Sequence, residues 1–239
     1  MPPKAVLFDM FDTLMMIKKN HDFYSPSLLR MYRYLKNKGI DEPFETFNTA
    51  YILARDQLYA KADPNLEEPH FNVRVAATLR NLGYDYHISS PIVTGATAQF
   101  CDEFMKFVYI DEQAEAVLGK LRGKYKLGIV SNFAIPECVY ELLNRYGLEK
   151  MFEVILVSGA VNKRKPSPEI FHSALKALDV SVSEAVFVGD TVDADVEGPK
   201  AVGMKTIYIE RRPEQEFANV KPDQTIKSLN ELPSLLEQL

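Results

Sequence analysis

The sequence of 239 residues has few cysteines and no excess of positive charge. Its two cysteines, Cys101 and Cys138, lie far apart and match no metal-ligand spacing, so they indicate neither a zinc site nor a disulfide framework. The formal net charge of −5 argues against nucleic acid as the main partner, because binding to a phosphate backbone depends on clustered Lys and Arg. We therefore expect two buried thiols and a small-molecule substrate.

The sequence also lacks the segments that direct a chain to a membrane or to secretion. No stretch reaches the ~18 apolar residues that a membrane-spanning helix requires. The N-terminus, Met-Pro-Pro-Lys, leads directly into a short apolar segment without the long hydrophobic stretch of a signal peptide. We therefore predict a cytoplasmic globular protein that does not bind membranes.

Short apolar runs alternate with amphipathic stretches, mainly in the second half of the chain. Five runs have the length and continuous apolar character of buried parallel strands. They cover residues 5–8, 127–130, 154–157, 185–188 and 206–209. Helices are expected at residues 136–146, 168–178 and 192–202, and a short closing helix at residues 228–239. This alternation predicts an α/β fold with a doubly wound parallel sheet of the Rossmann type.

The segment from residue 16 to residue 109 has helical patterning and few strand signals. Apolar positions recur near helical spacing around residues 51–59 and again around residues 73–79. We therefore predict an α/β core formed by residues 1–15 and 110–239, with an all-helical insertion at residues 16–109.

Polar side chains follow three of the predicted strands. Asp9 follows the first strand, Ser131 and Asn132 follow the second, and Asp190 follows a later one. Ligands of open parallel sheets bind outside these strand ends, so the side chains are expected to converge. Two carboxylates held close repel each other unless a cation compensates, and Mg²⁺ prefers such oxygen ligands. Phosphoryl transfer also needs fixed positive charge, which Lys165 would supply beside donors from Ser131 and Asn132.

Four segments, in order along the chain, resemble the motifs of the haloacid dehalogenase-like hydrolase superfamily. Residues 8–14, FDMFDTL, resemble its nucleophile loop, and residues 129–132, IVSN, resemble its second motif. Residues 165–171, KPSPEIF, are similar to its lysine motif, and residues 188–204, from VGD to GM, resemble its acidic motif. Each motif alone is a weak signal, whereas four in order span the predicted core.

The resemblance implies a role for each of these side chains. Asp9 would be the catalytic nucleophile that forms a covalent bond to the substrate, and Thr13, Ser131 and Lys165 would bind the transferring group. Asn132 would contact the substrate beside them.

The resemblance also implies a metal site and a lid. Asp9, Asp190 and the backbone carbonyl of Phe11 would hold Mg²⁺, with Asp195 in support. The insertion at residues 16–109 would be the helical cap that closes over the site and selects the substrate.

One position departs from the pattern of the phosphatases in this superfamily. They carry a second Asp two residues after the nucleophile, as general acid and base, and this chain has Phe11 there. A phenyl ring cannot transfer a proton, so a contribution of roughly 10²–10⁴-fold is missing. Asp12, one residue later, is interpreted as holding its turn through backbone hydrogen bonds. We still include Phe11 and Asp12 among the candidate substrate contacts.

Three functions remain open from the sequence. An aromatic residue at position 11 resembles the 2-haloacid dehalogenases, which act through an aspartyl ester without metal. Those enzymes generally replace the acidic motif, so the retained Asp190 favours a magnesium-dependent phosphatase that acts on a small phosphorylated metabolite. A catalytically weak binding or regulatory module is the third hypothesis, because the general acid is absent.

Several other residues are interpreted as structural. Lys163 and Arg164 precede Lys165 in a basic run, and such runs usually form solvated faces. Arg55 and Tyr59 fit an ordinary amphipathic helix better than a substrate pocket. The four histidines show no metal-ligand spacing and are expected to serve packing.

Overall fold

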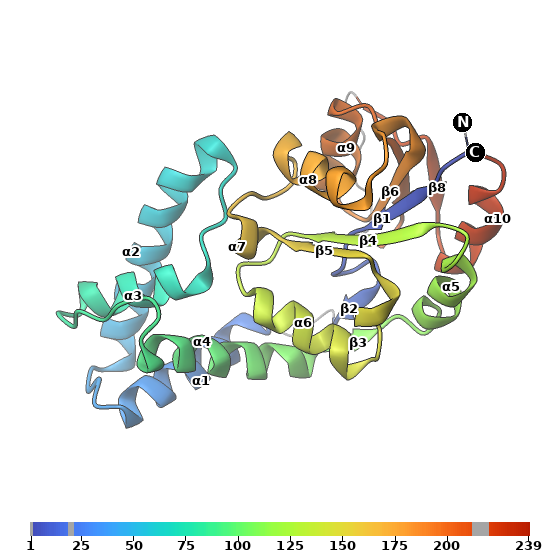
Figure 1. The fold of residues 1–239 in the computed structure, drawn as a ribbon. Helices are drawn as coiled ribbons and strands as arrows, with labels where there is room; N and C mark the ends of the chain where they lie inside the picture. The colour runs from blue at the N-terminus through green and yellow to red at the C-terminus, as the bar shows by residue number, and fades with distance from the viewer. Residues whose placement is uncertain (1, 19–21, 212–219) are drawn as a thin grey trace.

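The computed structural model describes residues 2–18, 22–211 and 220–239. At its centre lies a six-stranded sheet with the order β5-β4-β1-β6-β7-β8, and all neighbouring strands run parallel (Figure 1). The strands are β1 Ala5–Phe8, β4 Lys126–Ser131, β5 Val154–Val157, β6 Ala185–Gly189, β7 Lys205–Ile209 and β8 Gln224–Ile226. The predicted α/β fold with a parallel sheet is confirmed, and β1, which carries Asp9 at its end, is central.

Helices cover both faces of this sheet. They are α5 Ala114–Leu121, α6 Pro136–Arg145, α7 Ser158–Val161, α8 Pro168–Leu178, α9 Gly198–Ala201 and α10 Leu232–Leu236. Along β1, Ala5 and Leu7 belong to the apolar cluster formed with α8, whereas Val6 and Phe8 pack in the cluster with α5 and α6. Side chains of a strand alternate between its two faces, so β1 is buried from both sides.

Proline and a serine cap define where the helices of the core begin. Pro136 and Pro168 stand at the start of α6 and α8, where the missing amide proton costs no intrahelical hydrogen bond. The Ser167 hydroxyl accepts a hydrogen bond from the Glu169 amide at 3.4 Å and caps α8. Because α8 starts directly after Ser167, the loop that carries Lys165 has a fixed end.

The helical insertion consists of α1 Tyr24–Asn37, α2 Phe44–Ala62, α3 Phe71–Asn81 and α4 Pro91–Phe104. It projects to one side of the sheet (Figure 1). Strand β2, Met15–Ile17, pairs antiparallel with β3, Val108–Ile110, where the chain leaves and re-enters the core. The predicted helical segment is confirmed, but this pair of three-residue strands was not predicted because such short runs carry no clear periodicity. The predicted boundaries at residues 16 and 109 fall within the pair.

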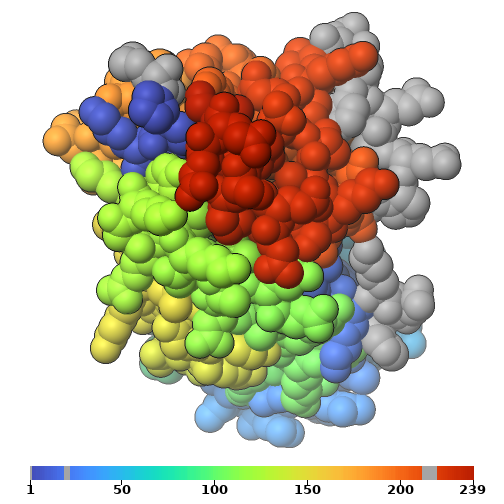
Figure 2. Space-filling model, turned by 90° about the vertical axis from the view of Figure 1, so that its right-hand side faces the viewer, coloured from blue at the N-terminus to red at the C-terminus, as the bar shows by residue number. Residues whose placement is uncertain are grey.

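The C-terminal segment adds the edge strand β8 beside β7, and the chain ends close to the N-terminal residues (Figure 1). Figure 2 shows residues 220–239 in red against the blue N-terminal residues and the green region of α5. Lys205 Nζ donates to the Leu239 carbonyl at 2.9 Å, and Ser228 Oγ donates to Gln113 Oε1 at 2.6 Å. The closing helix is confirmed as α10, while the short edge strand β8 was missed. No helix in the three described ranges is long and apolar enough to cross a membrane.

The prediction of one helix over residues 192–202 is wrong, because two different kinds of helix occupy this segment. A π-helix spans Val192–Glu197 and the α-helix α9 follows at Gly198–Ala201. Pro199 has no amide proton, so it cannot make the α-helical hydrogen bond to the carbonyl of Asp195. The wider turn places Asp195 one turn before that proline, at the edge of the sheet where Asp9 also lies.

Candidate active site

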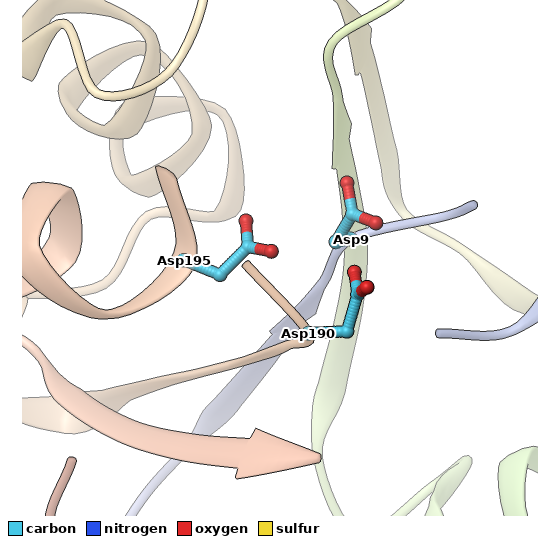
Figure 3. Close-up of side chains that lie close together, drawn as sticks. All are labelled: Asp9, Asp190 and Asp195. Carbon is cyan, nitrogen blue, oxygen red and sulfur yellow. The ribbon is translucent and has the colours of Figure 1, made fainter. Parts of the chain in front are cut away.

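Three aspartates from separate segments form the centre of the site. Asp9 follows β1, Asp190 follows β6, and Asp195 belongs to the π-helix. Each offers one carboxylate oxygen, and these three atoms lie within 4.8 Å of one another. The side chains point toward a shared space (Figure 3). All three are buried, with exposed fractions of 8%, 0% and 1% in that order, so the repulsion between them is poorly screened by water.

Lys165 places one ammonium group among these carboxylates. Its Nζ lies 2.6 Å from Asp9 Oδ1 and 2.7 Å from Asp195 Oδ1. Two hydrogen bonds fix its backbone, since Asn132 Nδ2 donates to the Lys165 carbonyl at 2.9 Å and the Lys165 amide donates to Asn132 Oδ1 at 2.8 Å. Asn132 therefore positions the loop that carries the lysine.

Burial and neighbouring charges shift the pKa values of Asp9 and Lys165. Burial raises the pKa of Asp9 to about 7; Lys165 opposes this shift, and Asp195 and Asp190 add to it. Burial alone would lower the pKa of Lys165, but the neighbouring Asp195 and Asp9 outweigh it, so this pKa is raised. Lys165 thus stays protonated, and it pairs with two of the three buried carboxyl groups.

The two oxygens of Asp195 are both engaged. Oδ1 accepts from Lys165, and Oδ2 accepts from the Thr191 amide at 2.9 Å. A Cβ atom on Gly189 would lie 2.5 Å from Asp195 Oδ2, so only glycine permits this close approach of the π-helix to β6. Asp195 therefore helps to hold Lys165 in place.

Two buried hydroxyls near the strand ends lack partners. Thr13 Oγ1 and Ser131 Oγ are both buried, and within the described part of the chain neither has a hydrogen-bond partner. Unsatisfied buried polar atoms are rare in proteins, and a bound ligand is one common reason for them. Their assignment as binders of the transferring group stays a prediction that this feature supports.

Asp12 occupies a different place in the same loop. Its backbone is left-handed, with φ of 58°, and its Oδ1 accepts from the Ile17 amide at 3.1 Å. The interpretation of Asp12 as a residue that holds its turn is confirmed. A contact between Asp12 and the substrate stays a prediction.

A cavity of about 350 Å³ opens at the cluster. Its lining includes Asp9, Phe11, Asn132, Lys165 and Asp195. The Phe11 ring packs against Phe133 and Phe104, with ring centroids 4.9 and 5.6 Å apart. Position 11 thus contributes an aromatic wall to the cavity and no group that transfers protons.

Lys163 and Arg164 are not a solvated face, so that prediction was wrong. Arg164 lines the cavity, and its Nη2 lies 2.7 Å from Asp63 Oδ1 in the helical insertion. Lys163 Nζ donates to the Asn65 carbonyl at 3.1 Å, and the Arg164 amide donates to Leu66 O at 2.9 Å. The basic run therefore joins the loop of Lys165 to the segment after α2, a contact that residue spacing cannot reveal.

Helices α3 and α4 of the insertion also contact the core, at and just before α6. The Phe71 amide donates to the Ala134 carbonyl at 2.9 Å, and His70 Nε2 lies 3.1 Å from Glu137 Oε2. Cys101 of α4 and Cys138 of α6 are buried free thiols that contact each other. The predicted burial of both thiols is confirmed, while their proximity was not predicted.

A second cavity, which we call the cap cavity, lies between the insertion and the core. Its volume is about 220 Å³, and its lining includes Tyr24, Tyr59, Glu68, Arg74 and Asn132. Tyr59, which was interpreted as an ordinary residue of an amphipathic helix, also lines this cavity. Arg74 was missed, since one arginine inside an amphipathic pattern carries no signal of its own.

Arg55 behaves as the sequence indicated. Its Nη2 pairs at 2.8 Å with Asp56, the neighbouring residue in α2. Its side chain is 37% exposed, as on the outer face of an amphipathic helix.

The parallel sheet, its acidic cluster and the helical insertion define a Rossmann-like α/β core with a helical cap. The chain belongs to the haloacid dehalogenase-like hydrolase family, whose characteristic sequence matches residues 3–203. Helices α1–α4, between β2 and β3, form the cap of this fold.

Two relatives with assigned names are phosphatases. The chain is 30% identical to the glyceraldehyde 3-phosphate phosphatase of Pyrococcus furiosus over 241 residues, which cover 99% of this chain and 92% of that protein. It is also 30% identical to the protein of the same name from Methanopyrus kandleri over 224 residues, covering 90% and 87%.

Among solved structures, a 2-haloacid dehalogenase from Pseudomonas syringae pv. Tomato superposes with a TM-score of 0.78 at 23% identity, covering 99% of both chains. A HAD phosphatase from Thermococcus onnurineus gives a TM-score of 0.65 at 27% identity, covering 98% of this chain and 97% of the other. Because the identity to the dehalogenase is low, that likeness shows the fold alone.

Proposed function

We propose that this protein is a magnesium-dependent phosphatase that hydrolyses a small phosphorylated metabolite. The observation that carries the proposal is the cluster of three buried carboxyl groups, Asp9, Asp190 and Asp195, whose oxygens lie within 4.8 Å of one another beside the ammonium of Lys165. Arg164 also lines the cavity, but its guanidinium pairs with Asp63. A divalent cation would reduce the repulsion among these carboxylates. The names of the two relatives at 30% identity point to hydrolysis of a phosphate ester.

The residues of the site fit magnesium. Asp9 and Asp190 would hold the ion together with the Phe11 carbonyl. Carboxylate and carbonyl oxygens are the ligands that Mg²⁺ prefers, and the nearest oxygens of the three aspartates lie within 4.8 Å of one another. Bound magnesium would supply positive charge to the oxygens of the phosphoryl group.

The chain's own groups would carry the chemical steps. The Asp9 carboxylate attacks phosphorus, the ester P–O bond breaks, and the alcohol leaves as the acyl phosphate forms on Asp9. Water then hydrolyses this intermediate, which releases phosphate and regenerates Asp9. Lys165, Thr13 and Ser131 bind the oxygens of the transferring group. Since Phe11 cannot donate a proton, the leaving alcohol takes its proton from water, and this step is slow for alkyl esters.

The proposal is tested by phosphate release from p-nitrophenyl phosphate, with Mg²⁺ and with chelator. We expect turnover that depends on magnesium, because the buried carboxylates repel an anionic ester without the ion. Turnover that is undiminished by chelator would contradict a role for the metal. No hydrolysis of this ester or of a metabolite panel would favour the binding or regulatory module.

A 2-haloacid dehalogenase is the second candidate, and the aromatic wall formed by Phe11 favours it. In that reaction Asp9 displaces halide from carbon, and no leaving group needs a proton. The acidic cluster disfavours it, since Asp190 would repel a haloacid carboxylate. Halide release from 2-chloropropionate in the presence of chelator would support this candidate, and its absence would count against it.

A further inference from the structure

The cap cavity adjoins the cavity that contains Asp9. Asn132 lines both, with the cap cavity on the side of Arg74 and Tyr59. A small ligand that extends from Asp9 past Asn132 would have its other end in the cap cavity. The residues there are placed to distinguish one substrate from another.

Arg74 is a buried cation that forms no ion pair with a carboxylate of the described residues. Its residue is 8% exposed; Nη1 donates to Tyr51 Oη at 3.1 Å and Nη2 donates to Tyr59 Oη at 2.8 Å. Its carbon Cζ lies 5.1 Å from the centroid of the Phe71 ring. Across residues 2–18, 22–211 and 220–239, no carboxylate forms an ion pair with Arg74, and its Nε has no acceptor. A buried guanidinium that forms no ion pair and keeps one unsatisfied donor is stabilised by an anionic ligand, so the cavity favours an anion.

Glu68 limits the charge of that anion. It is 7% exposed in the same cavity, where burial raises its pKa while Arg164 and Arg74 oppose the shift. The Tyr59 hydroxyl, which accepts from Arg74, also lies near this carboxyl group and acts to lower its pKa. A group with two negative charges would be repelled by Glu68, whereas a single charge can be balanced by Arg74.

We infer that Arg74 is a specificity-determining residue that binds a carboxylate at the end of the substrate remote from the phosphoryl group. A guanidinium presents a planar fork of donors that matches a carboxylate. The inference rests on the proposed phosphatase function and names its substrate class: small phosphomonoesters that also carry one carboxylate.

The test compares 3-phosphoglycerate with glycerol 3-phosphate, which has a hydroxymethyl group in place of the carboxylate. For the wild type with Mg²⁺, we expect kcat/KM to be about 10- to 100-fold higher for 3-phosphoglycerate, the range of a charge-assisted hydrogen bond. Arg74→Gln should abolish most of this preference, mainly through KM. Arg30→Gln is the matched control, because Arg30 is a cap arginine paired with Asp102 and Glu103 outside both cavities.

The outcomes separate a recognition role from a structural one. Equal kcat/KM of the wild type for the two esters overturns the inference. So does a parallel loss for both esters in Arg74→Gln, which would mean that Arg74 only supports the cap. If Arg74→Gln does not fold, the wild-type ratio decides together with Arg74→Lys, which keeps the charge but not the fork. An undiminished preference in Arg74→Lys also overturns the inference.

A binding measurement distinguishes failure of this inference from failure of the proposed function. Calorimetric titration of Asp9→Asn, with Mg²⁺ present, gives the affinity for each ester without turnover. If the wild type hydrolyses neither ester but this variant binds 3-phosphoglycerate about tenfold more tightly, phosphatase function fails and the assignment of Arg74 stands. If both esters are hydrolysed but bind equally, the function stands and the assignment of Arg74 fails.

Discussion

The core site and the cap cavity differ in the charged groups that they bury. In the core, three buried carboxyl groups, Asp9, Asp190 and Asp195, lie close together, and Lys165 pairs with two of them. In the cap cavity, Arg74 is buried among phenol hydroxyls and forms no ion pair with a described carboxylate, although Glu68 lines the same cavity. Under the two proposals, a cation would complete the first site and an anionic group the second. The difference indicates a division of labour, in which the core performs the chemistry and the cap selects the substrate.

Replacement of the proposed nucleophile in the core should have the largest effect on activity. Asp9→Asn should reduce phosphate release from p-nitrophenyl phosphate by about 10⁴-fold or more, because the amide cannot form the acyl phosphate. Asp85→Asn, at a side chain that is 88% exposed, is the control and should keep full activity. Comparable activity of Asp9→Asn and the wild type would mean that catalysis does not pass through Asp9.

Phe11 tests whether proton transfer to the leaving alcohol limits turnover in the core. Phe11→Asp should raise the hydrolysis of glycerol 3-phosphate by about 10²-fold, because the new carboxyl can protonate the leaving alcohol. p-Nitrophenolate needs no proton, so the same change should have little effect on its release from the aryl ester. Initial rates on the two esters give the comparison. An equal gain on both, or none on either, would show that proton transfer is not the limiting step.

Substitution of Gly189 tests the packing of β6 against Asp195 in the core cluster. Gly189→Ala would place a Cβ atom 2.4 Å from Asp195 Cγ and push that carboxylate away from Lys165. We expect stability to fall by about 1–3 kcal/mol, measured by urea unfolding, and activity to fall as well. Gly119→Ala is the control, because no atom lies within 4 Å of its added Cβ. Similar stability of the two variants would contradict the close approach of Asp195.

Substitution of Tyr59 tests how Arg74 is held in the cap cavity, and its expected effect is the smallest. Tyr59→Phe removes one acceptor from Arg74 and should change the preference for 3-phosphoglycerate by about 2- to 10-fold, as expected for one hydrogen bond. Tyr140→Phe, on the core helix α6, removes a hydroxyl that donates to Ile155 O and should leave the preference unchanged. If both variants behave alike in the ratio of kcat/KM, Tyr59 does not hold Arg74 for recognition.

Much of the core site was predictable because it depends on local patterns. A buried strand followed by a polar residue marks its own carboxyl end, so Asp9, Ser131 and Asp190 were found from the strands alone. Lys165 was found through a proline that fixes the start of α8. The form of the helix around Asp195 was not predictable, since a π-helix depends on packing against Gly189 and Pro199 as much as on composition.

The cap cavity shows what the sequence does not reveal. Arg74, Tyr59 and Glu68 come from separate cap segments, and the hydrogen bonds among them depend on how α2 and α3 pack. The contacts of Arg164 with Asp63 likewise join residues 101 positions apart. Periodicity indicates that a helix is amphipathic, but it does not indicate which polar side chain turns into a cavity.

The most direct test of the account is whether the acidic cluster binds magnesium. Calorimetric titration of Mg²⁺ into chelator-treated protein should show one site in the wild type and a loss of that site in Asp190→Asn. Asp193→Asn, an exposed acid three residues along the chain, should bind the ion as the wild type does. No binding by the wild type, or equal binding by Asp190→Asn, would contradict a metal site built on Asp9 and Asp190.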